Sequence, residues 1–295
     1  LDAARDRLAA APDGEVLELL ATARLRRLGW AGRFTEALGP SVRLLAGAVS
    51  RSDVLRLTAP TVLGLGQAGR FQDALQVAER HLRSAAAHQD DLPWLAGEIE
   101  VSAFLVHLWS GDVGRAEALL RAGSRPRRSF SGHDAFSTMG AGLVLTAHGQ
   151  WSDALRELRL ASARLSVIDP RGLAAFALAA QAVAAAAAGD GSLARRLLAE
   201  VSSTPLRASA AVESDVRLHL LDAGAWLRRD GLRADALALA RWCAERGLHR
   251  TEAEALHRAV LAGHLAGTSG AAEAAVVDRL AEVALGLDGD RPRGL

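Results

Sequence analysis

The residues whose type and spacing could do chemistry begin with a glycine-rich segment. Residues 64–69 read G-L-G-Q-A-G, which matches the G-x-G-x-x-G fingerprint that cradles the pyrophosphate of a dinucleotide. That fingerprint works only where a strand leads into it and a helix begins on it. The apolar spacing around residues 64–69 predicts instead a helix that ends at Gly69, so we interpret these glycines as structural.

A basic cluster is the second candidate for chemistry. Its guanidinium groups could bind a phosphate or another anionic partner. Runs of like charge more often simply face water, which is the interpretation that we favour here. The cluster comprises Arg121, Arg125, Arg127 and Arg128.

Histidine and cysteine give no catalytic or metal-binding set. The nine histidines are scattered, and neither H-E-x-x-H nor G-x-S-x-G occurs. Glu254-x-x-His257 is one copy of a spacing that di-iron bundles need twice, and His133-Asp134 is an isolated pair. The single cysteine, Cys243, permits no internal disulfide, and we expect it to fill core space. We expect no metal, no cofactor and no enzyme activity, with acid–base chemistry among scattered carboxylates and histidines as the remaining enzymatic alternative.

Composition excludes further protein classes. The chain has 295 residues, half of them apolar, and its 35 basic residues are all arginine because lysine is absent. Without lysine there is no complete phosphate-binding P-loop and no Schiff-base enzyme. The net charge of +1 lacks the basic excess of a nucleic-acid-binding domain. We expect a folded chain with a large core that binds neither ATP nor DNA itself.

The first residues of the chain and its longest uncharged run indicate where in the cell the protein is expected. Residues 1–11 are charged and amphipathic, unlike a signal peptide. The run Gly172–Gly189 is mostly alanine and short for a membrane span, so it predicts a buried helix. The only methionine is Met139, which indicates a piece of a longer protein. We expect a cytoplasmic chain that does not enter a membrane.

A repeated phrase organises the chain. It consists of a glycine, an aromatic residue two positions later and an alanine five positions after the glycine. The copies are spaced 37 to 42 residues apart, and a degraded seventh copy starts at Gly270 with Ala275 in the alanine position. The six clearer copies start at Gly32, Gly69, Gly111, Gly149, Gly189 and Gly231.

The physics of this phrase predicts pairs of helices. Glycine reaches left-handed backbone angles at low cost, so one helix ends there and the next begins with an aromatic residue and an acid. The alanine lets the two helices approach closely, and apolar residues such as Leu75, Ala78 and Leu82 follow helical spacing. Links between pairs are expected at 90–93, 123–129, 169–170 and 202–205. No second domain is evident, so we expect one domain over residues 1–295.

This pattern resembles tetratricopeptide repeats. The match is best in the copies at Gly32, Gly69 and Gly149, whereas Val113, Gly191 and Arg233 replace the aromatic residue in other copies. The period is near 40 residues instead of about 34. The resemblance implies an all-α fold, a right-handed superhelical solenoid of about seven antiparallel helix pairs.

The resemblance also implies which side chains line the concave face. In tetratricopeptide pairs the first helix faces inward, and counting back from each turn glycine gives an apolar, aromatic centre with arginine at both ends. Such a surface suits a small molecule or a peptide; the alternative is that these residues pack against neighbouring helices. The predicted ligand-binding residues are Arg26, Trp30, Arg56, Gln67, Glu98, Trp109, Phe136, Met139, Phe176 and Arg228.

The last part of the chain carries a more specific resemblance. The phrase G-L-H-R-T-E-A-E-A-L-H at 247–257, followed by V-D-R-L-A-E-V-A at 277–284, is similar to the end of the helical-repeat region in actinobacterial LuxR-type regulators with an ATPase domain. In that family an NTPase domain precedes the repeats and a helix-turn-helix follows them. The repeats are thought to sense an inducer or a partner protein and so to release inhibition of the ATPase.

Two functions remain open from the sequence. The first is a signal-sensing module of such a regulator, with the NTPase and DNA-binding domains elsewhere in the parent chain. The second is a protein-interaction scaffold, in which the arginines at the ends of the concave face would hold carboxylates of a peptide or protein. Strong weakening of binding by salt would favour the scaffold over an apolar pocket.

Overall fold

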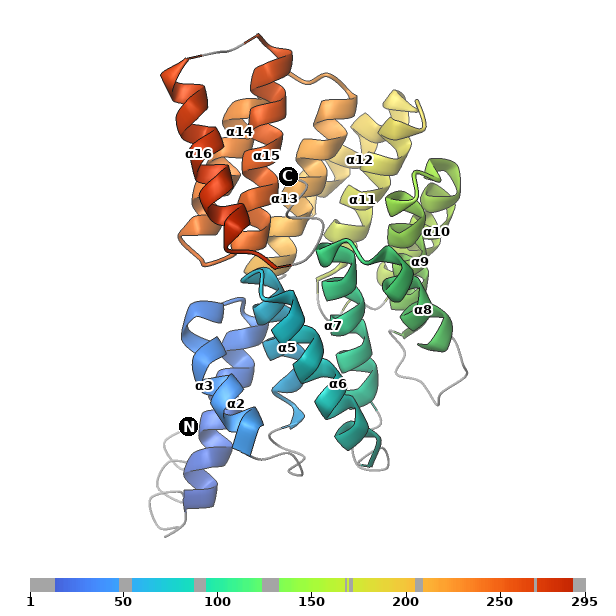
Figure 1. Ribbon diagram of the computed structural model, residues 1–295. Coiled ribbons are helices and arrows are strands. Elements are labelled where there is room, and N and C mark those ends of the chain that lie inside the picture. The colour runs from blue at the N-terminus through green and yellow to red at the C-terminus, as the bar shows by residue number, and fades with distance from the viewer. Residues whose placement is uncertain are drawn as a thin grey trace.

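The computed structural model describes residues 14–47, 55–87, 94–123, 133–167, 169, 172–204, 209–267 and 270–288. Throughout these ranges the regular structure is α-helix and no strand occurs, which confirms the all-α prediction (Figure 1). None of these helices is long and apolar enough to cross a bilayer. The helices are α2 (Gly14–Trp30), α3 (Phe34–Gly47), α5 (Thr58–Gln67), α6 (Phe71–Ala87), α7 (Leu95–Ser110), α8 (Val113–Gly123), α9 (His133–Ala147), α10 (Trp151–Leu165), α11 (Ala174–Ala187), α12 (Gly191–Ser203), α13 (Ala210–Trp226), α14 (Leu232–Ala244), α15 (His249–Leu265) and α16 (Ala271–Leu285).

Five of the six clearer repeat glycines end helices as predicted, and all six have φ between 72° and 91°. The sixth copy differs, because Arg228, with φ 53°, occupies the left-handed position after α13 and Gly231 is the N-cap of α14. At Gly69 the backbone N–H groups of Gly69 and Arg70 donate to the carbonyls of Gly66 and Leu65, at 3.0 and 2.9 Å. This arrangement is a Schellman turn, which needs a residue in the left-handed region after the helix.

The repeat alanines pack between helices. All six are at most 3% exposed, whereas Ala275 of the degraded seventh copy is exposed. The buried residues of α16 are Leu280 and Val283, so this helix packs on α15 through a different face. In the seventh copy Gly270 is the N-cap of α16, with φ 118°, whereas Gly267, with φ 68°, follows the end of α15, so this copy keeps neither the turn geometry nor the alanine packing.

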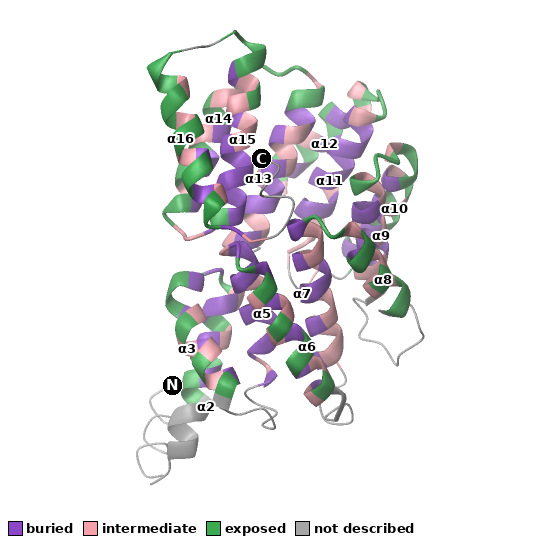
Figure 2. Ribbon diagram, viewed as in Figure 1, coloured by how far each residue is buried: buried purple, intermediate pink, exposed green. Residues whose placement is uncertain are grey.

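The alanine-rich run forms the buried helix that the sequence predicted. Eleven of the fourteen residues of α11 are buried, and the helix contacts α10, α12 and α13 (Figure 2). Its N-terminus is capped by Asp169, whose carboxylate accepts hydrogen bonds from the N–H groups of Leu173 and Ala174 at 2.7 and 2.8 Å. The link predicted at 202–205 begins later than expected, because α12 continues to Ser203. The link at 90–93 lies outside the described residues, as does 124–129 of the link at 123–129.

The glycine-rich segment at residues 64–69 is helical, which confirms its structural interpretation. Gly64 and Gly66 lie inside α5, where neighbouring side chains approach the backbone closely. A Cβ atom at Gly64 would lie 2.8 Å from the Phe34 ring, and one at Gly66 would lie 2.8 Å from Val106. These glycines let α3 and α7 pack against α5, and no strand precedes them in the described residues.

The chain curves until its last helices meet its first ones. Helix α15 packs against α5, and Figure 1 shows the lower ends of the red and orange C-terminal helices directly above the blue and cyan N-terminal ones. The side chain of Leu287 covers Gly69, and the Asp288 N–H donates to the Gly69 carbonyl at 2.9 Å. The Asp288 carboxylate in turn accepts hydrogen bonds from the N–H groups of Phe71 and Gln72, so it caps the start of α6. Contacts more than 200 residues apart in the sequence thus join the two ends of the described chain.

Candidate functional site

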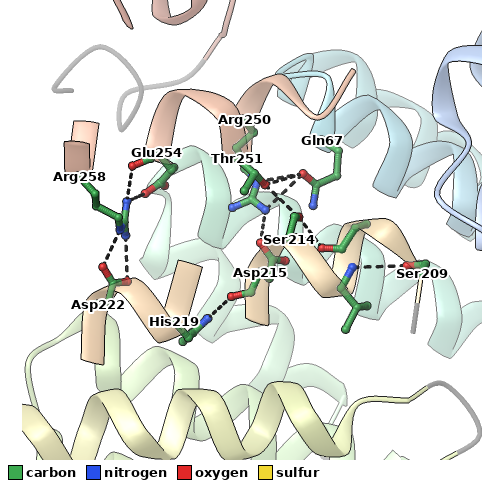
Figure 3. Close-up of polar contacts among 12 residues, drawn as sticks. Gln67, Ser209, Ser214, Asp215, His219, Asp222, Arg250, Thr251, Glu254 and Arg258 are labelled. Atoms are coloured by element: carbon green, nitrogen blue, oxygen red, sulfur yellow. Dashed lines mark hydrogen bonds and ion pairs between the residues drawn. The ribbon is translucent and has the colours of Figure 1, made fainter. Parts of the chain in front are cut away.

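A buried polar cluster lies where the ends of α5 and α7 meet the starts of α13 and α15. The Arg250 guanidinium forms an ion pair with Asp215 and donates to Gln67 Oε1 at 3.3 and 3.4 Å (Figure 3). The Trp109 ring lies against the same guanidinium, with 4.5 Å between its centroid and the guanidinium carbon. The Thr251 hydroxyl also donates to Gln67 Oε1, at 3.1 Å. We call these five residues the closing contact.

The closing contact is almost wholly removed from water. Arg250 is 4% exposed, Asp215 9% and Gln67 not at all. A buried charge is costly unless it is paired and hydrogen-bonded, so the guanidinium fixes the positions of its partners. The amide Nε2 of Gln67 is buried without a hydrogen-bond partner. The strength of ion pairs and hydrogen bonds depends on their direction more than on the area that they bury. The closing contact therefore fixes how α5 and α7 lie against α13 and α15.

A second row of charges continues along α15. Arg258 forms ion pairs with Asp222 on α13, at 2.6 Å, and with Glu254, also at 2.6 Å. Burial alone would lower the pKa of Arg258, but these two carboxylates outweigh it and raise the pKa. The Glu254 carboxylate of the spacing Glu254-x-x-His257 is thus engaged with Arg258. No group of three or more potential metal ligands occurs in the described part of the chain.

The start of α15 is also tied to α16. The Glu252 carboxylate accepts hydrogen bonds from Arg279 at 2.6 and 2.9 Å and lies 3.3 Å from His249 Nδ1. Burial alone would raise the pKa of Glu252, but hydrogen bonds from His249 and Arg279 lower it overall. Helix α15 is therefore joined to α13 and α16 by ion pairs and to α5 by hydrogen bonds to the neutral Gln67 amide.

Cys243 fills core space, as the sequence predicted. It is fully buried in the apolar cluster that joins α13, α14, α15 and α16. Burial raises the pKa of its thiol from 9.0 to about 12. At neutral pH the group is therefore a protonated, unreactive thiol.

Two of the predicted ligand-binding arginines come together around a tryptophan that the counting rule did not select. The guanidinium carbons of Arg26, on α2, and Arg56, just before α5, each lie 5.5 Å from the centroid of the Trp94 ring. All three side chains are half-buried. Among the described residues, no carboxylate forms an ion pair with either arginine, and the buried Nε of Arg26 has no hydrogen-bond partner. We call these three residues the arginine–tryptophan cluster.

The other predicted ligand-binding residues have different surroundings. Met139 and Phe176 are buried in one apolar core cluster, where the Phe176 ring packs edge-on to His219. Trp30 and Glu98 are half-buried, and Arg228 is exposed in the turn after α13, with φ 53°.

Phe136 lines a small groove between α7, α8 and α9. The groove measures about 390 Å³, including space open to solvent. Its other apolar side chains include Val101, Phe104 and Leu120. Eight of the ten predicted residues are thus divided among the closing contact, the arginine–tryptophan cluster, this groove, the core and the exposed turn after α13, and the other two, Trp30 and Glu98, lie on α2 and α7 outside these places.

The basic cluster is only partly described. Arg121 is exposed and donates to Glu117 at 3.0 Å, one helical turn away. Arg125, Arg127 and Arg128 lie outside the described residues. For Arg121 the expectation of a solvated charge is confirmed.

Sequence reasoning gave no role to Asp215, Arg250 or Thr251. One signal was present, because residues 250, 251, 252 and 254 are polar and spread over more than half of the circumference of the first turns of a helix. A helix with so wide a polar face must bury some of these residues when it lies between other helices. Comparison with known proteins adds no assignment, since neither a family model nor a curated protein matches the chain.

The closing contact predicts strong coupling between Arg250 and Asp215. Arg250→Met or Asp215→Leu alone leaves a buried charge unpaired and should cost about 3–5 kcal/mol of unfolding free energy. The double variant removes both charges and should cost clearly less than the sum of the singles. Urea unfolding measures all three. In the exposed pair Arg70–Asp73, the same changes should each stay within about 0.5 kcal/mol; additive losses at Arg250 and Asp215 would contradict the geometry.

Because its thiol is buried and stays protonated, Cys243 should make the folded chain lose stability at alkaline pH. The chain has neither lysine nor tyrosine, so Cys243 is the one side chain whose ordinary pKa lies between 9 and 12. The unfolded thiol ionises from pH 9 while the folded one stays protonated, so stability is complete below pH 9 and falls toward pH 12. The expected slope is about 1.4 kcal/mol per pH unit. Urea unfolding at pH 8 and 11 should show this loss in the native chain and not in Cys243→Ala; equal losses in both would refute the assignment.

Proposed function

We propose that the chain is the signal-sensing domain of a LuxR-type transcriptional regulator and that it is a tetratricopeptide-like, right-handed solenoid of seven antiparallel helix pairs. The six turn glycines with positive φ and the six buried alanines support the repeat architecture. The phrase at 247–284 supports the regulator family. The NTPase and helix-turn-helix domains would lie elsewhere in a cytoplasmic parent protein, and this chain itself would bind neither ATP nor DNA.

The observation that carries the regulatory proposal is the polar character of the closing contact. An apolar interface loosens gradually, whereas a buried ion pair is either made or broken, because its strength depends on direction and on exclusion of water. The contact joins helices far apart in the sequence, so breaking it changes the curvature of the whole chain. A ligand that binds better to one of these two arrangements shifts the population toward it.

The signal in this proposal is a small-molecule inducer or a partner protein. The arginine–tryptophan cluster is built from α2 and the residues just before α5 and α7, whereas the closing contact uses the far ends of α5 and α7. A ligand that moves α5 relative to α7 therefore acts on both places through the same two helices. The ligand needs only a modest difference in binding free energy between the two arrangements, since allosteric couplings are typically about 1–3 kcal/mol.

A peptide-binding scaffold is the second candidate function. The groove beside Phe136 favours it, because Phe104, Leu119 and Leu120 give an apolar lining that could accept a peptide side chain. In that case the parent reading frame would lack both the NTPase and the helix-turn-helix.

The parent protein provides the test of the regulatory proposal. Its reading frame should encode a phosphate-binding loop upstream of Leu1 and a helix-turn-helix downstream of Leu295. In that protein, Arg250→Glu places a negative charge against Asp215, breaks the closing contact and should raise basal ATPase activity several-fold without inducer. Leu287→Asp, which disturbs the cover of Gly69, provides an independent second variant.

Controls make the ATPase result specific. Arg70→Glu removes an exposed ion pair with Asp73 close to the closing contact and should leave the basal rate unchanged. Circular dichroism checks that each variant stays helical. A frame without the two domains, or folded Arg250→Glu and Leu287→Asp proteins with unchanged ATPase activity, would refute the proposed function.

A further inference from the structure

We propose that the arginine–tryptophan cluster of Arg26, Arg56 and Trp94 is a binding site for a small dianionic ligand that carries a phosphate group or two carboxylates. The proposal names the chemical class of the signal and rests on the proposed function only for its regulatory meaning. Binding itself depends on these three side chains alone.

Arg26 and Arg56 differ in their charge surroundings from many other arginines of the described chain. Thirty-four acids balance thirty-five arginines over the whole chain, and many of the described arginines form ion pairs with nearby carboxylates. Arg26 and Arg56 contact no carboxylate in the part of the chain that the structure describes, although both are half-buried. Within the described residues these two half-buried positive charges have no carboxylate partner and repel each other, and a dianion removes that repulsion by neutralising both.

The guanidinium groups of Arg26 and Arg56 lie beside the same tryptophan ring. Each guanidinium carbon lies 5.5 Å from the centroid of the same indole ring, so the two carbons are at most twice that distance apart. Stacking on the ring restricts how each planar fork can turn, which reduces the entropy lost on binding. Guanidinium forks match the oxygens of carboxylate and phosphate groups in a bidentate manner. The cluster therefore places two guanidinium groups of restricted orientation beside one ring before any ligand arrives.

Arg26 also carries a hydrogen-bond donor that has no acceptor. The Nε atom of Arg26 is removed from solvent and makes no hydrogen bond. Leaving such a donor unmet costs free energy, and native structures rarely tolerate it without a reason. An oxyanion held by Arg26 would accept from this atom together with one terminal nitrogen of the same fork once the side chains that cover the atom shift on binding.

The three residues come from three separate parts of the chain. Arg26 lies on α2, Arg56 lies two residues before α5, and Trp94 directly precedes α7. A ligand held by both arginines would therefore draw α2 and the start of α5 toward α7. This coupling makes the site suited to report ligand binding to the rest of the fold.

Calorimetric titration of the whole chain tests the proposal with three probes in 0.15 M sodium chloride: inorganic phosphate, succinate and acetate. We expect saturable binding of phosphate or succinate and at least tenfold weaker binding of acetate, which has one charge. Binding of phosphate alone identifies a phosphoryl ligand, and binding of succinate alone identifies a dicarboxylate. Binding of both leaves the site selective for dianions in general, which also supports the proposal.

Variants tie the binding to the site. Arg26→Gln and Arg56→Gln should each weaken binding at least tenfold, whereas Arg26→Lys should weaken it less because a charge remains without the fork. Arg33→Gln removes an exposed arginine that is already paired with Glu36 and should change nothing. Trp94→Phe should abolish any fluorescence change caused by the probe while keeping a ring for the arginines.

Two results would overturn the site. One is the absence of saturable binding by phosphate and succinate. The other is binding that Arg26→Lys, Arg26→Gln and Arg56→Gln all leave unchanged while the proteins remain helical. Because these titrations need no ATPase domain, a failed ATPase test with successful titrations would refute the regulatory proposal and leave the anion site standing.

Discussion

The rest of the structure depends on one buried guanidinium. Arg250 lies between the Trp109 ring, the Asp215 carboxylate and the Gln67 amide oxygen, almost fully removed from water. A charge in that environment is tolerated only while its partners remain in place. Four helices, α5, α7, α13 and α15, must therefore meet at one point, and the path of the chain between them is constrained accordingly.

Glycine makes this meeting sterically possible. At Gly69 the same residue ends α5 with a left-handed backbone and leaves room for Leu287, so one sequence position serves both the repeat and the contact between the chain ends. Gly32 does the same for Ala210, whose backbone nitrogen would lie 2.9 Å from a Cβ atom at that position. The turns of the first two repeat copies are thus also docking surfaces for the last part of the described chain.

Much of the local structure could be predicted from the sequence, because its causes are local. A turn glycine followed by an alanine five residues later determines where a helix ends and which face of the next helix packs. All six clearer copies bury the alanine and five end a helix at the glycine, whereas Arg228 ends α13 in the sixth. The exception is Ala275, which has the right spacing and is exposed because α16 packs through Leu280 and Val283. Spacing shows which residue can be buried but not which face of a terminal helix has a neighbour.

The long-range contacts could not be predicted, because a repeat pattern describes each helix only against its neighbours in the chain. Counting back from the turn glycines selected Gln67 and Trp109, yet these residues meet Arg250, a residue more than 140 positions away. The same counting selected Arg26 and Arg56, but it left out Trp94, which precedes the first residue of α7 and so lies outside any helical register. Seeing which of these side chains share a site required the curvature of the whole chain.

An engineered disulfide tests the contact between the first and last helices most directly. A Cβ atom at Gly69 would lie 3.2 Å from the Cβ of Leu287, close to the separation of about 3.5–4.5 Å in a disulfide. The account predicts that Gly69→Cys with Leu287→Cys cross-links rapidly under mild oxidation, while buried Cys243 does not take part. Gly189→Cys with Leu287→Cys is the matched control, because Gly189 has a similar φ of 88° and no atom within 4 Å of its added Cβ. A folded Gly69→Cys/Leu287→Cys protein that cross-links no faster than this control would contradict the account.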